Sequence, residues 1–130
     1  MWFKNLQNYR LPKTLPFGAD GLAAQLAAGV LQACAATSAQ SLGWVAPTPG
    51  GALVHVVNRC WLIALGAEQR LLPTAVVKAA VRERAQAIEA SQGRRVGRRE
   101  LRELAEALTL ELLPRAFVCR RTTFGWIDPV

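Results

Sequence analysis

Hydrophobic and polar positions change their spacing several times along the chain, which predicts both strands and helices. Residues 2–11 mix aromatic and aliphatic residues with polar ones and are expected to form a first strand. Asp20 can cap a helix that runs to about Ala36. Its apolar positions follow helical spacing: Leu22, Leu26, Val30 and Leu31. Alanine and glycine fill the other side of this helix, which favours close packing on a sheet.

The middle of the chain predicts a short strand and a β-hairpin. Residues 37–51 have the Ser, Pro and Gly of a connection, within which residues 43–45 can form a short strand. Residues 52–57 and 60–65 are apolar stretches on either side of Asn58 and Arg59. This spacing is typical of two antiparallel strands joined by a two-residue turn.

A helical hairpin is predicted over about residues 73–113. Pro73 is placed as the first residue of a helix that runs to about Gln92, and Gly93 ends it. A second helix is expected to start near Gly97, with Glu100 at its third position. Its core stripe is Leu101, Leu104, Leu108, Leu112 and Leu113.

The order of elements predicts the fold class. Pro114 ends the second helix, and residues 116–127 have the pattern of a returning strand. We therefore expect an α+β fold, in which an antiparallel sheet is combined with three main helices, two of them forming the basic helical hairpin. No boundary is predicted within residues 1–130. Because the last strand has no partner strand after it, we expect the N-terminal part of a longer protein, whose apolar edge self-associates.

Composition narrows the choice of partner. Hydrophobic residues make up 52% of the 130 residues, enough to bury a core. Sixteen Lys and Arg residues against nine Asp and Glu residues give a net charge of +7, which favours a polyanionic partner or simply a solubilising surface. No secretory signal or membrane-length apolar stretch is apparent, so a cytoplasmic protein without membrane contact is expected.

The strongest local signal is a run of five arginines and one glutamate over residues 94–102, at the junction of the two helices. Arginine binds phosphate oxygens through two parallel hydrogen bonds, so the run predicts contact with a DNA strand that does not distinguish bases. The alternative is a solvated hairpin end without a ligand. Arg115 and Phe117 form a second group, expected to share one face of the last strand, although Phe117 could equally be a core residue.

No catalytic, metal or cofactor site is predicted. The single histidine, His55, lies in an apolar stretch without a nucleophile or acid at a recognisable spacing. Cys34, Cys60 and Cys119 are far apart and are expected to be free thiols. The helical glutamates are expected to pair with arginines of their own helix.

Six blocks of sequence resemble the RdgC family of recombination-associated proteins. They are residues 2–6 (WFKNL), 9–11 (YRL), 43–47 (GWVAP), 72–78 (LPTAVVK), 112–117 (LLPRAF) and 126–128 (WID). The blocks occur in the family's order and extend over nearly the whole chain. Members of the family are longer, so the likeness covers their N-terminal part, and ring closure by this chain alone is in doubt.

The resemblance implies a function. RdgC proteins bind double-stranded DNA with little sequence preference, restrain RecA-promoted strand exchange and form a homodimeric ring, which implies a nucleoid-associated protein without enzymatic activity. Carried over by position, it assigns DNA contacts to Arg94, Arg95, Arg98, Arg99 and Arg115, and a DNA or dimer contact to Phe117. Two alternatives remain open: an assembly domain that binds an acidic protein, and a nuclease.

Overall fold

A computed structural model describes residues 4–129, and the contacts within it divide the chain into two compact units. The first, here called the sheet unit, comprises Met1–Val30, Gly43–Gly66 and Thr122–Val130. The second, the hairpin unit, comprises Leu31–Leu42 and Ala67–Arg121.

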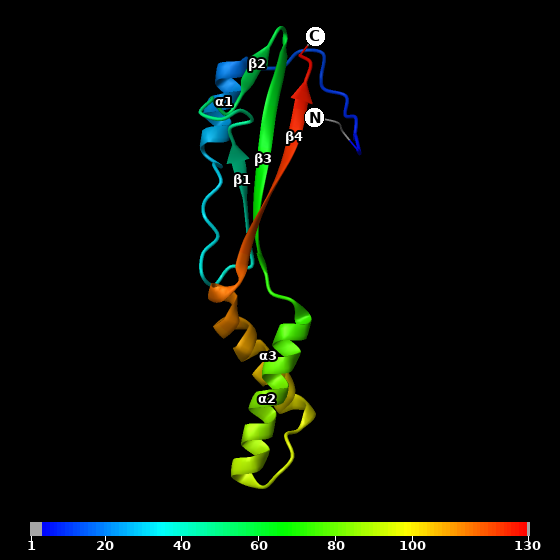
Figure 1. Cartoon of the computed structure of the whole chain (residues 1–130). Coiled ribbons are helices and arrows are strands. Elements are labelled where there is room, and N and C mark those ends of the chain that lie inside the picture. The colour runs from blue at the N-terminus through cyan, green and yellow to red at the C-terminus, as the bar shows by residue number, and fades with distance from the viewer. Residues whose placement is uncertain (1–3, 130) are drawn as a thin grey trace. The chain divides into compact units, whose positions relative to one another are not determined.

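The element order confirms the predicted α+β class (Figure 1). The elements are α1 (Ala19–Ala27), β1 (Gln40–Val45), β2 (His55–Val57), β3 (Cys60–Leu71), α2 (Thr74–Gln92), α3 (Arg98–Leu112), the 3-10 helix η1 (Leu113–Arg115) and β4 (Phe117–Ile127). The long strand β3 is the centre of the antiparallel sheet, because β1, β2 and β4 all pair with it.

The predicted β-hairpin is confirmed with shifted ends. β2 and β3 pair antiparallel with His55 opposite Leu62 and Val57 opposite Cys60. Asn58 takes a left-handed φ of 54° in the two-residue turn, a conformation that asparagine tolerates better than most residues. β2 is shorter than the predicted strand over residues 52–57, because it begins at His55. β3 extends beyond the predicted end at residue 65 to Leu71.

The sheet unit is held by a core between α1 and the strands. Leu22 and Leu26 of α1 are buried together with Val54 and Trp61, and further apolar side chains pack around them, among them Phe17, Trp44, Ile63 and Ile127. Each fully buried large side chain stabilises the fold by about 1.5–3 kcal/mol. Leu22 and Leu26, which helical spacing placed on one face of the predicted helix, both belong to this core.

The first helix is shorter than predicted at its C-terminal end. α1 ends at Ala27, where Ala28 and Gly29 donate hydrogen bonds to the carbonyls of Gln25 and Leu26. Trp44 then donates its backbone N–H to the carbonyl of Gly29 at 2.8 Å, and Val30 forms a parallel bridge with Trp44. Pairing with β1 thus replaces further helical turns, and it is favoured at Gly29 because a Cβ there would approach the Trp44 ring to 3.3 Å.

Two other predictions at the N-terminal end were wrong. Gly18, rather than Asp20, is the N-cap residue of α1. Asp20 lies in the first turn, where its carboxylate interacts favourably with the helix dipole. Residues 4–11 form no helix or strand, so the expected first strand is absent there. The remaining two positions of that prediction, Trp2 and Phe3, lie outside the described residues.

Candidate nucleic-acid interface

The basic run lies at the end of a helical hairpin whose limits agree with the prediction. Pro73 is the N-cap residue of α2, so the helix begins at Thr74, one residue later than predicted. Gly93 ends the helix with a left-handed φ of 63° and donates its N–H to the carbonyl of Glu89 at 2.9 Å. Gly97 is the N-cap of α3, so Glu100 occupies the predicted third position.

The two helices lie side by side and bury a narrow seam (Figure 1). Ala85 of α2 and Leu108 of α3 are buried, and Leu113 is buried just beyond α3. Of the predicted core stripe, Leu104 and Leu112 are half-buried, whereas Leu101 is 37% exposed. Because apolar contacts occupy only the facing sides, the charged residues of both helices are directed to solvent.

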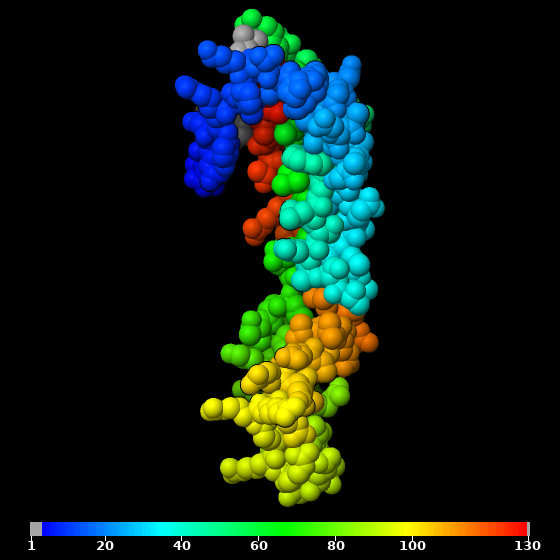
Figure 2. All heavy atoms as spheres, turned by 180° about the vertical axis from the view of Figure 1, so that it is seen from behind, coloured from blue at the N-terminus to red at the C-terminus, as the bar shows by residue number. Residues whose placement is uncertain are grey.

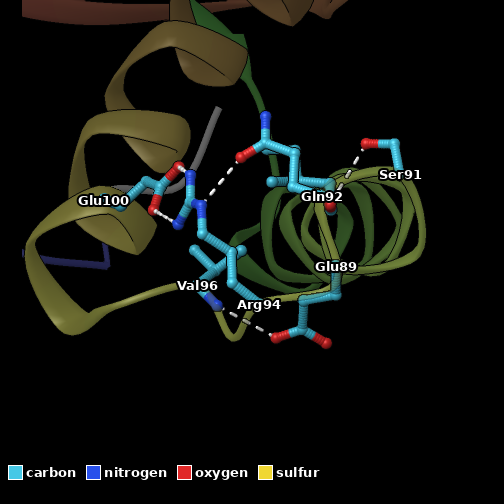
Figure 3. A network of polar contacts seen from close by, with 7 residues as sticks. Glu89, Ser91, Gln92, Arg94, Val96 and Glu100 are labelled. Atoms are coloured by element: carbon cyan, nitrogen blue, oxygen red, sulfur yellow. Dashed lines mark hydrogen bonds and ion pairs between the residues drawn. The ribbon is translucent and has the colours of Figure 1, made fainter.

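The turn between the helices is organised by an ion pair that the sequence did not predict. Arg94 donates two parallel hydrogen bonds to Glu100, of 2.8 and 2.9 Å, and a third of 2.7 Å to Gln92 (Figure 3). The backbone N–H of Val96 donates to the carboxylate of Glu89 at 3.1 Å. The hydrogen bond from Arg94, followed by its positive charge and a backbone hydrogen bond from Gly97, holds the pKa of Glu100 below its ordinary value. Arg94 is thus engaged within the turn.

The other arginines of the run remain exposed to solvent. The side chains of Arg95, Arg98 and Arg102 are exposed and make no hydrogen bond or ion pair with any residue of the range 4–129. Arg99 pairs with Glu103 one helical turn away at 3.0 Å, but its side chain is 91% exposed, and such pairs contribute about 0.3–0.5 kcal/mol. Seen from behind, side chains from this end of the hairpin project well beyond the surface (Figure 2). Three to four guanidinium groups are therefore accessible to a ligand.

The structure separates Arg115 and Phe117 from this cluster. Arg115 belongs to η1 and Phe117 begins β4, at the opposite end of α3 from Arg98. A helix of 15 residues places the two groups about 22 Å apart. The expectation that Arg115 and Phe117 share one strand face was wrong, because Arg115 is not in the strand. The alternative that Phe117 is a core residue is also wrong, since it is 86% exposed.

Sequence analysis missed a polar network in the hairpin unit, centred on Glu68 and Arg70 of β3. Glu68 is 9% exposed, accepts the N–H of Cys34 at 2.9 Å and pairs with Arg120 at 2.6 Å. Those contacts, the Cys34 hydrogen bond first and then the Arg120 hydrogen bond, lower the pKa of Glu68. A glutamate and an arginine two apart in an otherwise apolar strand were the available signal, because they share one face.

The pairing of acids also differs from the prediction. Arg99 and Glu103 pair within α3 as expected, but Arg84 of α2 pairs with Glu111 of α3 at 3.7 Å, and Glu100 pairs across the turn. Helix-to-helix pairs form here because α2 and α3 are antiparallel neighbours. Arg120 is paired with Glu68, so of the two adjacent arginines in β4 only Arg121 has no acidic partner within residues 4–129.

Groups that could hold a metal ion do not come together in the described part of the chain. Among residues 4–129 there is no cluster of three or more His, Cys, Asp and Glu side chains placed to hold a metal ion. Cys34, Cys60 and Cys119 are free thiols, and Cys34 donates to the carbonyl of Ser38 at 3.0 Å. Across the same residues, no helix has the length and apolar character needed to span a bilayer.

These features define an α+β protein with an arginine-rich helical hairpin. The chain belongs to the RdgC family, because the family model described as "Putative exonuclease, RdgC" matches residues 1–130. It is 50% identical over 129 residues to the recombination-associated protein RdgC of Dechloromonas aromatica (strain RCB), covering 99% of this chain and 42% of that protein. It is 47% identical over 130 residues to that of Janthinobacterium sp. (strain Marseille), covering 100% of this chain and 43% of that protein. The chain thus spans about two fifths of the length of these relatives.

The charge of Glu68 predicts a pH dependence of stability. Its pKa is lower in the folded protein than the ordinary 4.5, so its contribution is present above pH 4.5 and is lost as pH falls through the folded pKa. We expect Glu68→Gln to lower the free energy of unfolding at pH 7, and the difference from the unsubstituted protein to shrink below pH 4.5. Urea unfolding at pH 7, 5, 4 and 3 measures this. A difference that stays constant across that range would show that the carboxylate charge contributes nothing.

Proposed function

We propose that the chain binds double-stranded DNA without sequence preference through the arginines at the end of the α2–α3 hairpin. The observation that carries the proposal is the exposure of Arg95, Arg98 and Arg99 around a turn that Arg94 and Glu100 hold in place. Guanidinium groups bind phosphate oxygens in pairs, and phosphates are the same at every base pair. Such a surface supplies affinity without sequence information.

The position of two arginines at the start of α3 supports a binding role. Arg98 and Arg99 occupy the first two positions of the helix, and Glu100 is the one acidic residue of its first turn. Positive charge at a helix N-terminus opposes the helix dipole and costs about 0.3–1 kcal/mol. Free backbone N–H groups at the same end favour an anion. An arrangement that costs stability in the free protein becomes favourable when phosphate oxygens approach.

The family supports a role in recombination. The relatives are named recombination-associated proteins. We extend the proposal to restraint of RecA-promoted strand exchange, without catalytic activity, by a chain located at the nucleoid. We further propose that the protein self-associates as a homodimer. Phe117 and Val118, at the start of β4 in the hairpin unit, are 86% and 48% exposed, and exposed apolar residues of this kind favour a protein contact.

The arginine cluster generates a direct prediction. Replacing Arg95, Arg98 and Arg99 by Ala should weaken binding to all duplexes alike, and should reduce the slope of log affinity against log salt by about two to three. Arg94 is left in place because it holds Glu100. Fluorescence anisotropy with two unrelated duplexes at several salt concentrations measures this.

Arg10→Ala combined with Arg59→Ala is the control, because both arginines are exposed and lie in the sheet unit. This variant should keep nearly the full slope. Unchanged binding by the triple variant, with its helical circular dichroism intact, would contradict the proposed interface. Binding that depends on salt only for acidic proteins, and not for DNA, would favour the assembly-domain alternative.

The absence of enzymatic activity is a separate prediction. Incubation of end-labelled duplex with the purified protein and Mg²⁺ or Mn²⁺ should leave the DNA full length, because residues 4–129 contain no group of three or more His, Cys, Asp and Glu side chains that could hold a metal ion. Gel electrophoresis of the products measures this. Degradation that copurifies with the protein, and that is lost when its own acids are replaced, would make the chain a nuclease.

If the protein forms the proposed homodimer through Phe117, truncating this residue should weaken the dimer. An aromatic residue at the centre of an interface costs about 2 kcal/mol or more when truncated, so Phe117→Ala should raise the dimer dissociation constant roughly thirtyfold or more. Light scattering over a dilution series measures the average mass. Leu110→Ala, at a residue 62% exposed in the same unit, is the matched control and should leave the mass unchanged. A protein that is monomeric at all concentrations would refute self-association.

A further inference from the structure

Where the chain leaves α3, away from the arginine-rich turn, backbone carbonyl groups accept hydrogen bonds from a residue of another element. Arg70 of β3 donates from Nη1 to the carbonyls of Leu113, Pro114 and Ala116, at 3.4, 3.2 and 3.5 Å. All three belong to the segment in which α3 passes through η1 into β4. A single guanidinium nitrogen with two hydrogens therefore serves three acceptors that follow one another closely in the chain.

The other nitrogens of the same guanidinium hold a second segment. Nη2 donates to the carbonyl of Cys34 at 3.1 Å, and Nε donates to the carbonyl of Ala35 at 3.3 Å. The backbone N–H of Arg70 also donates to the carbonyl of Ala39 at 2.8 Å. Arg70 thus joins the connection before β1 to the return from the hairpin, and all of these residues belong to the hairpin unit.

The physical need for this contact comes from the segment that follows α3. The last carbonyls of a helix lack intrahelical donors, and a positive charge at that end is favourable. The 3-10 helix η1 continues directly from α3, and Pro114 within it has no N–H to offer. Arg70 of β3 donates to the carbonyls of Leu113, Pro114 and Ala116 in this segment and adds its positive charge to that of Arg115.

The held carbonyls alternate with two exposed side chains. Arg115 lies between Pro114 and Ala116, and Phe117 follows Ala116. Arg115 is exposed and Phe117 is 86% exposed. When the carbonyls of residues 114 and 116 are fixed on the Arg70 side, the directions of these two side chains are fixed as well. We infer that Arg70 is a positioning residue, which orients Arg115 and Phe117 for contact with duplex DNA and with a second copy of the chain.

This inference rests on the proposed DNA binding, but part of it can be tested without DNA. Arg70→Lys keeps the positive charge, whereas a single ammonium group cannot reach both segments. We expect faster hydrogen exchange at the amides of residues 115–118 in this variant, including Ala116, whose N–H now bonds to the carbonyl of Leu113 at 3.1 Å. Exchange in α1, which lies in the sheet unit, should not change.

A double-mutant cycle tests the functional part. Arg115→Ala removes one phosphate contact and should weaken duplex binding roughly two- to fivefold. Arg70→Lys should weaken it by a similar factor, and the double variant should bind no more weakly than Arg115→Ala alone, because Arg70 acts through Arg115. Arg70→Lys combined with Arg95→Ala should instead show multiplied losses. Glu68→Gln is the control, since it alters the neighbouring polar contacts and leaves the Arg70 donors in place, and it should keep the full affinity.

Unchanged exchange at residues 115–118 in Arg70→Lys would overturn the inference, and so would losses that multiply in the double variant with Arg115→Ala. Full affinity in Arg115→Ala would overturn the part of the inference that concerns DNA, because Arg115 would then not contact it. The positioning of Phe117 is then decided by the exchange measurement and by the dimer mass of Arg70→Lys, which should shift in the same direction as that of Phe117→Ala.

Discussion

The return of the chain from α3 is held by Arg70, which donates hydrogen bonds to carbonyl groups in and just after η1. Its guanidinium bonds to the carbonyls of Leu113, Pro114 and Ala116 on one side, and to those of Cys34 and Ala35 on the other. A buried or half-buried carbonyl without a donor costs about 1–3 kcal/mol, so several such groups cannot be left unpaired at one place. The return into β4, and with it the placement of the exposed aromatic residue at its start, depends on this contact.

The two ends of α3 use arginine in opposite ways. At the C-terminal end, Arg70 is bonded to backbone and stabilises the helix. At the N-terminal end, Arg98 and Arg99 lie where positive charge is unfavourable, and the pair of Arg94 with Glu100 fixes the turn beside them. The contacts at the C-terminal end therefore stabilise the fold, whereas the exposed positive charge at the N-terminal end lowers the stability of the free protein. That exposed charge is the part of α3 available to a polyanion.

Local signals in the sequence predicted most of the fold and only part of the candidate site. Helical spacing and glycine positions predicted the limits of α2 and α3 closely, because Gly93 marks the end of the first helix and Gly97 the start of the second. The end of α1 was missed, since pairing of Val30 with Trp44 is a contact between distant residues. The Arg70 contacts were missed for the same reason. They join positions 35 to 46 residues apart, and no local pattern encodes them.

The central claim is that exposed arginines at the end of the hairpin bind the phosphates of duplex DNA. It is tested most directly by measuring the affinity of the unsubstituted protein for two duplexes of unrelated sequence over a range of salt concentrations that includes physiological salt. The account predicts equal affinities for both duplexes and a steep linear decrease of log affinity with log salt. A strong preference for one sequence, or an affinity that does not change with salt, would contradict it.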